Sequence, residues 1–396
     1  MRTLLSADLL PVIATQAAEA DRTRTVSPDV IAAIKASPLI AMAATPEIGG
    51  LGTSIGDVAR ELEAIAAACG SSAWCLWNHL SVFHLYAGAL GPVHAALLRS
   101  IVERREWVCF PAGAGSQAYG RLDATAGEIT IDGPTTFGSG CRYGEWTGVA
   151  FALVDPATGK PGSPPDLRFT AVRLDEASVC IEPTWDGMAL RASATDTVRH
   201  HGTRVPVSRC VPWYAANRAE IFRKADFPVI HPRYREDWVG VSNLWLGAQA
   251  TGAAGAAIDE AAAGVRDRRA ILGAAMVDMP MVSMRLGEAA AMVSAARAAV
   301  DVGCREIDDR VEAAVQPTED DYLRQLALSA QALRLCRDAM DHVLTVLGGN
   351  GLRESGSFER RYRDILAMPL HINAHPDRVY DKVGRHLIGA PAVAKF

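Results

Sequence analysis

Hydrophobic residues recur at helical spacing along the first hundred positions of the chain. Ile55 to Ala68 carries apolar side chains every three or four positions, Ser71 to Leu90 is apolar almost throughout, and Val93 to Val102 repeats the pattern over a shorter length. Apolar residues at this spacing lie on one face of a helix, which is then buried. Residues 1–105 are therefore predicted to form a helical domain.

The pattern then changes to short runs of β-branched and aromatic residues. Ile129–Ile131, Val149–Val154 and Phe169–Val172 are such runs, and Gly, Pro and Asp residues separate them. Short runs between turn residues are typical of strands. We predict a β domain over residues 106–215.

Long alanine-rich helical periods follow in the last part of the chain. The three longest predicted helices are Trp238–Arg266, Pro280–Ala314 and Glu319–Leu347. Each is long enough to run the length of a helix bundle. Glycines from Gly348 onward end the third helix, and a last one is expected near Phe358. Residues 216–396 thus predict a helical bundle domain, and the whole chain an α+β protein.

Composition narrows the class of protein. With 396 residues, the chain is expected to form two or three domains with a large core. Its net charge of -5 and its lack of a basic run argue against a nucleic-acid partner. The opening residues contain no apolar stretch long enough for a signal peptide or a membrane span. We expect a cytoplasmic protein with no membrane partner.

Cysteines and histidines give little sign of a metal site. The eight cysteines are scattered without a close pair, so we interpret most of them as small buried hydrophobic residues. His371 and His375 would share a face if their segment were helical, which suggests zinc. No glutamate follows the first histidine and no third ligand is evident nearby. We predict no metal.

Two stretches of small residues suggest a site for a flat ligand. Phe137–Trp146 has Gly and Ser residues between aromatic ones, and the glycine-rich run Pro111–Ser116 precedes it. Small residues let a flat ligand approach the backbone, and Ser139 adds a hydroxyl group. An ordinary strand-turn-strand connection is the alternative interpretation.

Motifs spread over nearly the whole chain resemble those of the acyl-CoA dehydrogenase superfamily. They are Phe110–Ser116, Trp185–Met188, Val205–Val207, Arg269–Gly273, and Gly348–Gly351 with Glu359 and Arg363–Asp364 beyond. The resemblance implies that superfamily's fold, with an N-terminal helical domain, a middle β-barrel-like domain and a C-terminal four-helix bundle. It also implies a bound flavin and a homotetramer.

The chain departs from the dehydrogenases at the catalytic position. Acyl-CoA dehydrogenases commonly use a glutamate nine residues after the arginine of their Arg-Asp pair, and Ile372 stands there, between His371 and Asn373. Isoleucine cannot accept a proton. A histidine at this place, with the Ser139–Cys141 turn, resembles the flavin-dependent monooxygenases of this fold, which include phenol hydroxylases, dibenzothiophene monooxygenase and nitrososynthases.

This second resemblance implies a chemistry and the roles of several residues. Such enzymes take reduced FMN or FAD from a separate flavin reductase and use O2 to form a C4a-hydroperoxyflavin. They then oxygenate a small organic substrate, here expected to be aromatic or an amine. The hydroperoxide needs a dry site and a hydrogen bond at flavin N5. Ser139 matches the residue at N5 and Phe137 the one beside the flavin ring, and we count Gly140 and Trp146 with them as cofactor-binding.

Further cofactor contacts are implied at the phosphate-bearing end of the flavin. Arg269 matches an arginine that reaches this end across a dimer interface. Leu272 stands where a phenylalanine is typical, which leaves FMN or FAD open. Gly348 and Gly349 would offer free backbone groups at a helix end.

Proton transfer is expected from a histidine, because its pKa lies near neutrality. His371 is the first candidate, and His375 either orients it or faces solvent. His79 resembles a substrate-pocket histidine of these enzymes, although His84 is close enough to be the functional one. For these histidines, an ordinary core role is the alternative. The expected substrate-binding residues are Trp74, Trp77, His79 and His375.

Two other functions stay open at this point. One is an acyl-CoA dehydrogenase, or an enzyme that combines dehydrogenation with oxygenation, with Asp259 or Glu260 of a bundle helix near the catalytic base position. The other is a flavin-free scaffold, which the presence of Ser139, Arg269 and Gly348 disfavours.

Overall fold

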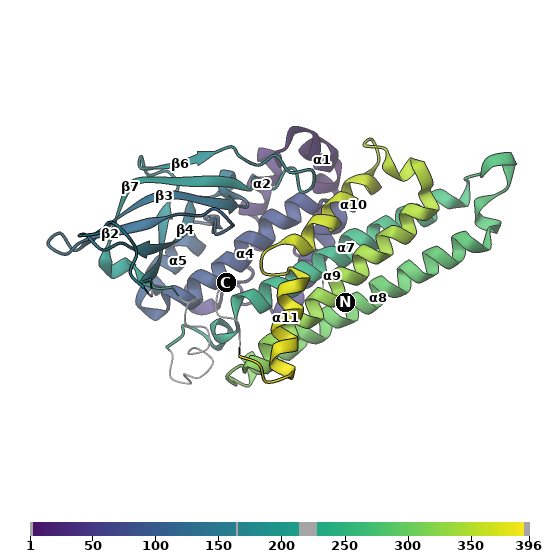
Figure 1. Ribbon diagram of the computed structural model, residues 1–396. Coiled ribbons are helices and arrows are strands. Elements are labelled where there is room, and N and C mark those ends of the chain that lie inside the picture. The colour runs from purple at the N-terminus through teal and green to yellow at the C-terminus, as the bar shows by residue number, and fades with distance from the viewer. Residues whose placement is uncertain (1–2, 164, 214–227, 392–396) are drawn as a thin grey trace.

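The computed structural model describes residues 3–163, 165–213 and 228–391. A sheet lies at one end of the molecule, a bundle of long helices extends from the other, and the N-terminal helices pack between them (Figure 1). The boundary that we predicted at residues 215–216 lies outside the described residues. The division into three domains stays a prediction.

Helices dominate the N-terminal part, as the hydrophobic pattern predicted. They are α1 (Leu10–Thr23), α2 (Pro28–Ala36), α3 (Ile55–Ala68), α4 (Gly70–Leu90) and α5 (Ala95–Glu103). Serine side chains cap two of them: Ser27 Oγ accepts from Val30 N at 3.3 Å, and Ser54 Oγ accepts from Asp57 N at 3.0 Å. Helix α4 is buried along nearly its whole length, so it supplies both core and cavity surface.

The middle strands form one mixed eight-stranded sheet. They are β1 (Val108–Cys109), β2 (Tyr119–Asp123), β3 (Glu128–Gly138), β4 (Trp146–Leu153), β5 (Leu167–Arg173), β6 (Val179–Glu182), β7 (Asp196–Pro206) and β8 (Val211–Pro212). Their order is β6-β7-β3-β2-β4-β5-β8, with β1 paired to β4. The β4 strand pairs in parallel with β1 and β2, and the other pairs are antiparallel. Among the described strands, no pairing joins β6 to β8 to close a barrel.

The C-terminal part is the predicted bundle. Its helices are α7 (Trp238–Arg266), α8 (Pro280–Glu312), α9 (Glu319–Leu347), α10 (Ser357–Ala367) and α11 (Pro376–Leu387). The predicted bounds of α7 and α9 are confirmed. A capping box begins α9, where Thr318 Oγ1 accepts from Asp321 N at 3.2 Å and Asp321 Oδ2 accepts from Thr318 N at 2.8 Å.

Short 3-10 turns connect these elements. They are Pro38–Ala41, Pro46–Ile48, Pro92–His94, Cys141–Tyr143, Val207–Arg209, Pro232–Arg235, Ile271–Gly273, Met276–Asp278, Gly348–Leu352 and Met368–Leu370. Six of the eight cysteines are buried and none of the eight is in a disulfide, which confirms the interpretation of most of them as core residues.

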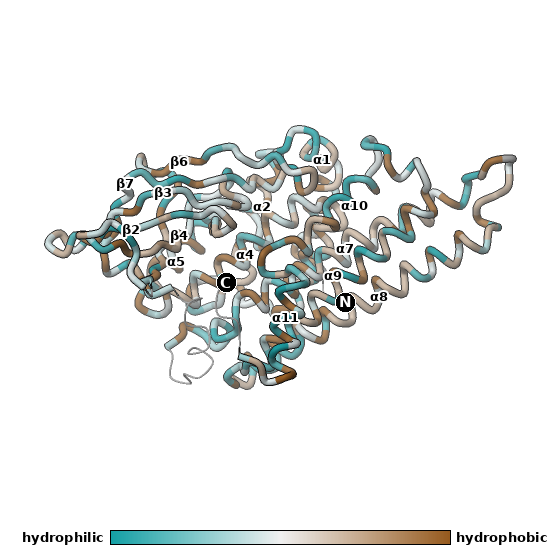
Figure 2. The backbone as a smooth tube through the Cα atoms, viewed as in Figure 1, coloured by the Kyte–Doolittle hydropathy of each residue, from teal (hydrophilic) through white to brown (hydrophobic). Residues whose placement is uncertain are grey.

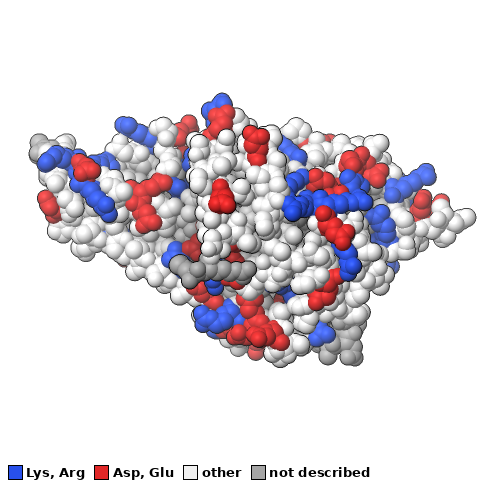
Figure 3. Space-filling model, turned by 180° about the vertical axis from the view of Figure 1, so that it is seen from behind, with Lys and Arg blue, Asp and Glu red and all other residues white. Residues whose placement is uncertain are grey.

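The outer surface carries charged side chains of both signs. Helix α11 is mostly hydrophilic (Figure 2). On the face seen from behind, acidic and basic side chains are interspersed (Figure 3). Over the described ranges, no single helix has both the length and the apolarity of a membrane span, while the bent pair Gly70–Leu90 and Pro92–Glu103 meets these two criteria together.

Candidate functional site

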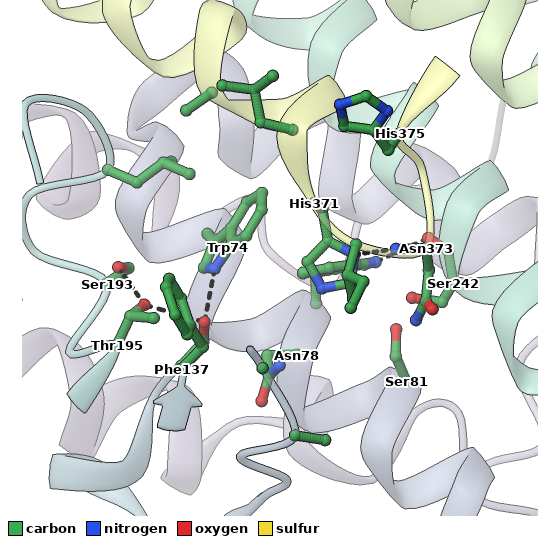
Figure 4. Close-up of a pocket in the computed structure, with 18 of the residues that line it drawn as sticks. Trp74, Asn78, Ser81, Phe137, Ser193, Thr195, Ser242, His371, Asn373 and His375 are labelled. Carbon is green, nitrogen blue, oxygen red and sulfur yellow. Dashed lines mark hydrogen bonds between the residues drawn. The ribbon is translucent and has the colours of Figure 1, made fainter. Parts of the chain in front are cut away.

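A cavity of about 820 Å³ lies where the sheet, α4, α7 and the segment before α11 meet. This volume is typical of sites for cofactors and small molecules. The sequence-predicted residues that line it are Trp74, Trp77, Phe137, Ser139, His371 and His375. Figure 4 shows Phe137 on one side of it, and His371 between Phe137 and Asn373. The structure thus joins residues that are up to 301 positions apart, from Trp74 to His375.

One wall of the cavity is an aromatic ring on strained backbone. Phe137 has a φ of 60°, in the left-handed region that bulky residues rarely adopt, and it remains 54% exposed. A Cβ atom at Gly113 would lie 2.4 Å from Phe137 Cδ2, so only glycine fits beneath the ring. This contact explains why the two small-residue stretches belong to one site. Trp185 meets Phe137 edge to face, with ring centroids 6.3 Å apart.

Hydroxyl groups form a chain beside this wall. Trp74 Nε1 donates to Ser139 Oγ at 2.9 Å, Ser139 Oγ lies 2.9 Å from Thr195 Oγ1, and Thr195 Oγ1 lies 2.6 Å from Ser193 Oγ. An indole N–H can only donate, so Ser139 must accept from Trp74. The Ser139 hydroxyl proton is then directed either at Thr195 or at a ligand.

Helix α4 forms the floor of the cavity with one of its faces. Trp74, Trp77, Asn78 and Ser81 line the cavity at helical spacing, and the two indole rings are 4.7 Å apart. Asn78 Oδ1 and Ser81 Oγ are buried and have no hydrogen-bond partner in the described part of the chain. We did not predict Asn78 or Ser81. Continuing the face of Trp74 and Trp77 by one turn would have identified them.

His371 lies against the same helix face. Its ring centroid is 5.8 Å from that of Trp74 and 5.1 Å from that of Trp77, both near edge to face. Burial lowers the pKa of His371 to about 4, so the ring is neutral at pH 7. Its Nδ1 accepts a long hydrogen bond from Asn373 N at 3.4 Å. Its Nε2 has no hydrogen-bond partner among the described residues.

The segment from His371 to His375 is not helical. The two histidines therefore do not share a helix face, which was the basis for considering zinc. It lies between the 3-10 turn that ends at Leu370 and helix α11, which begins at Pro376. His375 also lines the cavity. Among the residues that the structure describes, no three His, Cys, Asp or Glu side chains are grouped to hold a metal ion.

The Arg363–Asp364 pair supports another part of the wall. Arg363 Nη1 donates to Met188 O at 2.6 Å, and Asp364 Oδ1 accepts from Leu190 N at 2.6 Å. Both Met188 and Leu190 line the cavity. Burial raises the pKa of Asp364 to about 7. The pair therefore positions the loop after Trp185 rather than contacting the cavity itself.

His79 does not line the cavity, and its expected place in the substrate pocket stays a prediction that these contacts do not support. Its Nε2 lies 2.9 Å from Ile40 O, and its Nδ1 accepts from Val108 N at 3.0 Å. Both ring nitrogens are thus used by the backbone, and burial lowers the pKa of His79 to about 4. His84 is buried against Glu236 O, at 3.0 Å, and does not line the cavity either.

Two residues of the Phe137–Trp146 stretch contact other parts of the protein, and their assignment to the cofactor stays a prediction. Gly140 has a φ of 76°, donates its N–H to Ser193 O at 2.8 Å and packs near Trp107. Trp146 is buried and donates Nε1–H to Glu106 Oε2 at 2.6 Å. Neither residue lines the cavity. An alternating strand sends neighbouring side chains to opposite faces, and no local pattern showed which face would meet the ligand.

None of the expected phosphate-end residues lines the cavity. The segments that carry them, the connection between α7 and α8 and the turn Gly348–Leu352, lie at the end of the bundle remote from the sheet (Figure 1). Arg269 Nη1 donates to Gly273 O at 2.9 Å, and Arg268 Nη2 donates to Leu347 O at 3.2 Å. The second contact places the connection after α7 beside Gly348 and Gly349. These residues form a group of their own, separate from the cavity-lining residues.

The alternative base is also outside the cavity. Glu260 Oε1 pairs with Arg361 Nη1 at 2.7 Å, and its other oxygen accepts from Ser357. Asp259 and Glu260 are exposed on α7 and do not line the cavity. Ile372, at the usual position of the dehydrogenase glutamate, does line it.

The chain resembles known hydroxylases over nearly its whole length. Residues 244–376 match the family model described as acyl-CoA dehydrogenase, C-terminal domain. The pigment production hydroxylase of Rhodococcus sp. (strain ATCC 21145) is 23% identical over 390 residues, which cover 97% of this chain and 95% of that protein. The oxygenase component of p-hydroxyphenylacetate 3-hydroxylase from Acinetobacter baumannii is 22% identical over 391 residues, which cover 96% of this chain and 87% of that protein.

A solved structure shares the fold. XiaF from Streptomyces sp., in complex with FADH2 and glycerol, superposes with a TM-score of 0.87 at 20% identity and covers 98% of this chain and 95% of its own. The chain therefore has the acyl-CoA dehydrogenase fold that its motifs predicted.

Proposed function

We propose that this protein is the oxygenase component of a flavin-dependent monooxygenase. It would take reduced FMN or FAD from a separate reductase and use O2 to oxygenate a small organic substrate, aromatic or an amine. The observation that carries the proposal is one cavity with Phe137 and Ser139 on one side, His371 beside them, and isoleucine at position 372. The likeness to hydroxylases over the whole chain supports it.

The cavity fits the flat ring system of a flavin. Phe137 offers an exposed face over Gly113, and the strain on its backbone is of the kind that accompanies ligand sites. Asn78 Oδ1 and Ser81 Oγ leave hydrogen-bonding capacity for bound molecules. When bound, reduced flavin would react with O2 and supply the oxygen atom.

Ser139 is suited to a ring nitrogen whose protonation changes with oxidation state. Because Trp74 occupies one acceptor position, the serine either donates its proton to the ligand or gives it to Thr195 and accepts instead. A hydroxyl that can take both roles can serve flavin N5 before and after reduction. The indole rings of Trp74, Trp77 and Trp185 would keep water from this place.

His371 is proposed to move the substrate proton. At pH 7 its ring is neutral, because burial lowers its pKa to about 4, and a neutral imidazole can accept a proton. Its partner-free Nε2 can take the proton only in the tautomer protonated on Nδ1, and this tautomer gives up the long 3.4 Å hydrogen bond from Asn373 N. His375, the residue directly before α11, lines the same cavity and would border the substrate.

Arg269, Gly348 and Gly349 are proposed to hold the phosphate-bearing end of a flavin bound in a second copy of the chain. Their absence from the cavity lining of their own chain supports this assignment, as does the contact between Arg268 and Leu347, which brings their two segments together. The Arg269 guanidinium suits a phosphate. Gly348 stands at the C-terminal end of α9, so the two glycines would offer room for close approach rather than a favourable helix dipole.

Dehydrogenation is less well supported by the geometry. It requires a carboxylate near the reacting carbon, and Glu260 is instead paired with Arg361 on the outside of α7. We therefore do not propose Asp259 or Glu260 as a base.

Rapid mixing tests the proposal. Anaerobic protein with reduced FMN, or with reduced FAD, is mixed with aerated buffer while flavin absorbance and hydrogen peroxide are followed. We expect the wild-type protein to delay flavin reoxidation relative to free reduced flavin. Ser139→Ala should shorten this delay about tenfold, the effect of one lost hydrogen bond.

Ser72→Ala is the matched control, since Ser72 is buried on α4 but does not line the cavity. It should keep the wild-type delay. Reoxidation in wild-type protein at the rate of free flavin, with immediate peroxide release, would contradict the oxygenase proposal.

A further inference from the structure

One side of the cavity is lined by uncharged polar groups. We call Asn78, Ser81, Ser242 and Asn373 the polar end of the cavity. In Figure 4, Ser81, Ser242 and Asn373 lie close together on one side of His371, and Phe137 lies on the other side. Asn78 lies between Phe137 and Ser81. Two contacts hold this end together: Trp77 Nε1 donates to Ser242 O at 2.8 Å, and Asn243 Nδ2 donates to Asn373 O at 2.9 Å.

Two atoms of the polar end are buried without a partner. Asn78 is 9% exposed and Ser81 is 2% exposed, and neither Asn78 Oδ1 nor Ser81 Oγ has a hydrogen bond within the described residues. An unpaired buried polar atom is costly, and native proteins rarely keep one without a reason. Both side chains line the cavity, so a rotation of either side chain would bring its unpaired oxygen to a ligand, which can provide the missing partner.

The charge of the lining decides what kind of group fits there. Its ionisable side chains are His371, His375, Asp377 and Arg378, and the last two lie in the first turn of α11 directly after His375. Figure 4 places His375 away from Asn78 and Ser81. None of the four residues of the polar end is charged, so an anionic group buried there would gain no counter-charge from them, which is unfavourable.

We infer that the polar end binds an uncharged hydrogen-bonding group, a hydroxyl or a carboxamide, of a flat aromatic ligand, with Asn78 and Ser81 as the specificity-determining residues. A serine hydroxyl and an asparagine amide can each donate and accept, which matches a hydroxyl or a carboxamide. The aromatic part would lie against Trp77 and His371, beside the place proposed for the flavin ring at Phe137 and Ser139. That this ligand is the substrate rests on the oxygenase function proposed above.

Calorimetric binding to the full-length protein tests the inference with three probes of one shape. They are 2-naphthol, 2-methylnaphthalene and 2-naphthoate, each titrated with and without oxidised FMN. Wild-type protein is expected to bind 2-naphthol about tenfold more tightly than 2-methylnaphthalene, the equivalent of one or two hydrogen bonds. The 2-naphthoate anion should bind more weakly than 2-naphthol.

The variants Ser81→Ala and Asn78→Leu should each reduce the preference for 2-naphthol over 2-methylnaphthalene severalfold, and Ser72→Ala should leave it unchanged. The ligand-free Ser81→Ala protein should unfold at the same temperature as wild type or higher, because removing an unpaired buried hydroxyl relieves its cost. A merely structural serine would lower the unfolding temperature.

Either of two results would overturn the inference. One is 2-naphthoate binding as tightly as 2-naphthol in wild-type protein. The other is a preference for 2-naphthol that persists in both variants. These measurements need neither reduced flavin nor oxygen, so they can succeed even if the rapid-mixing experiment contradicts the oxygenase function.

Discussion

His79 and His371 have similar electrostatics and different surroundings. Burial lowers the pKa of each to about 4. His79 has both ring nitrogens engaged with the backbone, whereas His371 has an Nε2 without a partner in the described chain and lines the cavity. A histidine in an apolar helix therefore indicates burial, and its hydrogen-bond partners decide whether it can act on a ligand.

The pKa of His79 predicts how stability depends on pH. Its folded-state pKa of about 4 lies below the ordinary value of 6.5, so the unfolded chain binds the extra proton first as pH falls. The contribution of His79 to the free energy of unfolding is complete above the ordinary pKa. It is lost as pH falls from there toward 4, by up to about 1.4 kcal/mol per pH unit.

Chemical denaturation of wild type and His79→Gln, in steps of roughly half a pH unit from pH 7 to pH 4.5, tests this predicted loss of stability. The variant should lose less stability than wild type as pH falls, even though it is less stable at neutral pH. The half-buried His94 supplies the control, because His94→Gln should change the slope less. Parallel curves for wild type and His79→Gln would show that the ring does not titrate in this range.

Helices α3 and α7 approach each other closely because of one glycine. A Cβ atom at Gly252 would lie 2.0 Å from Glu63 O, so any larger residue must push the helices apart. This contact helps to set the position of α7, whose N-terminal half carries Ser242 into the cavity wall.

Gly252→Ala should lower the free energy of unfolding by about 2 kcal/mol, the usual cost of overpacking. Gly287→Ala is the opposite case, since Gly287 is exposed in α8 and a Cβ atom there meets nothing within 4 Å. It should raise stability by about 0.5 kcal/mol or more, because alanine favours the helix. Equilibrium urea unfolding measures both. Equal effects of the two substitutions would contradict the assigned packing.

At the scale of the whole molecule, the bundle end remote from the sheet exposes large apolar side chains. Ile271 is 90%, Met281 68% and Met284 71% exposed, on the connection after α7 and at the start of α8. Arg269 and Gly348 lie at the same end. Exposed apolar surface of this kind is typical of subunit contacts, and we predicted a homotetramer from the sequence.

Light scattering after size exclusion tests the oligomeric state. The wild-type protein should elute with four times the chain mass of 42.2 kDa. A double variant, Met281→Glu with Met284→Glu, should give a smaller species. Val93→Glu, at an 87% exposed site on the N-terminal part, is the control and should keep the tetramer. A monomeric wild-type protein would contradict this prediction and the assignment of Arg269 to a second copy.

The sequence by itself determined the elements and their order. Helical and strand periods are local, so the bounds of α3, α7 and α9 agree with the predicted ranges. It also indicated the two stretches that meet at Gly113 and Phe137. Close approach to a flat ring requires small residues such as glycine, and these can be recognised in the sequence without knowing the fold.

Only the tertiary structure decided which side chains share the cavity. It placed Asn78, Ser81 and Thr195 there and left out His79, Gly140 and Trp146. The reason is physical: burial is common to core and cavity residues, and the direction of a buried side chain depends on helices and strands that are distant in sequence. Ser139, for example, finds its partners on α4 and just before β7, 65 and 56 residues away.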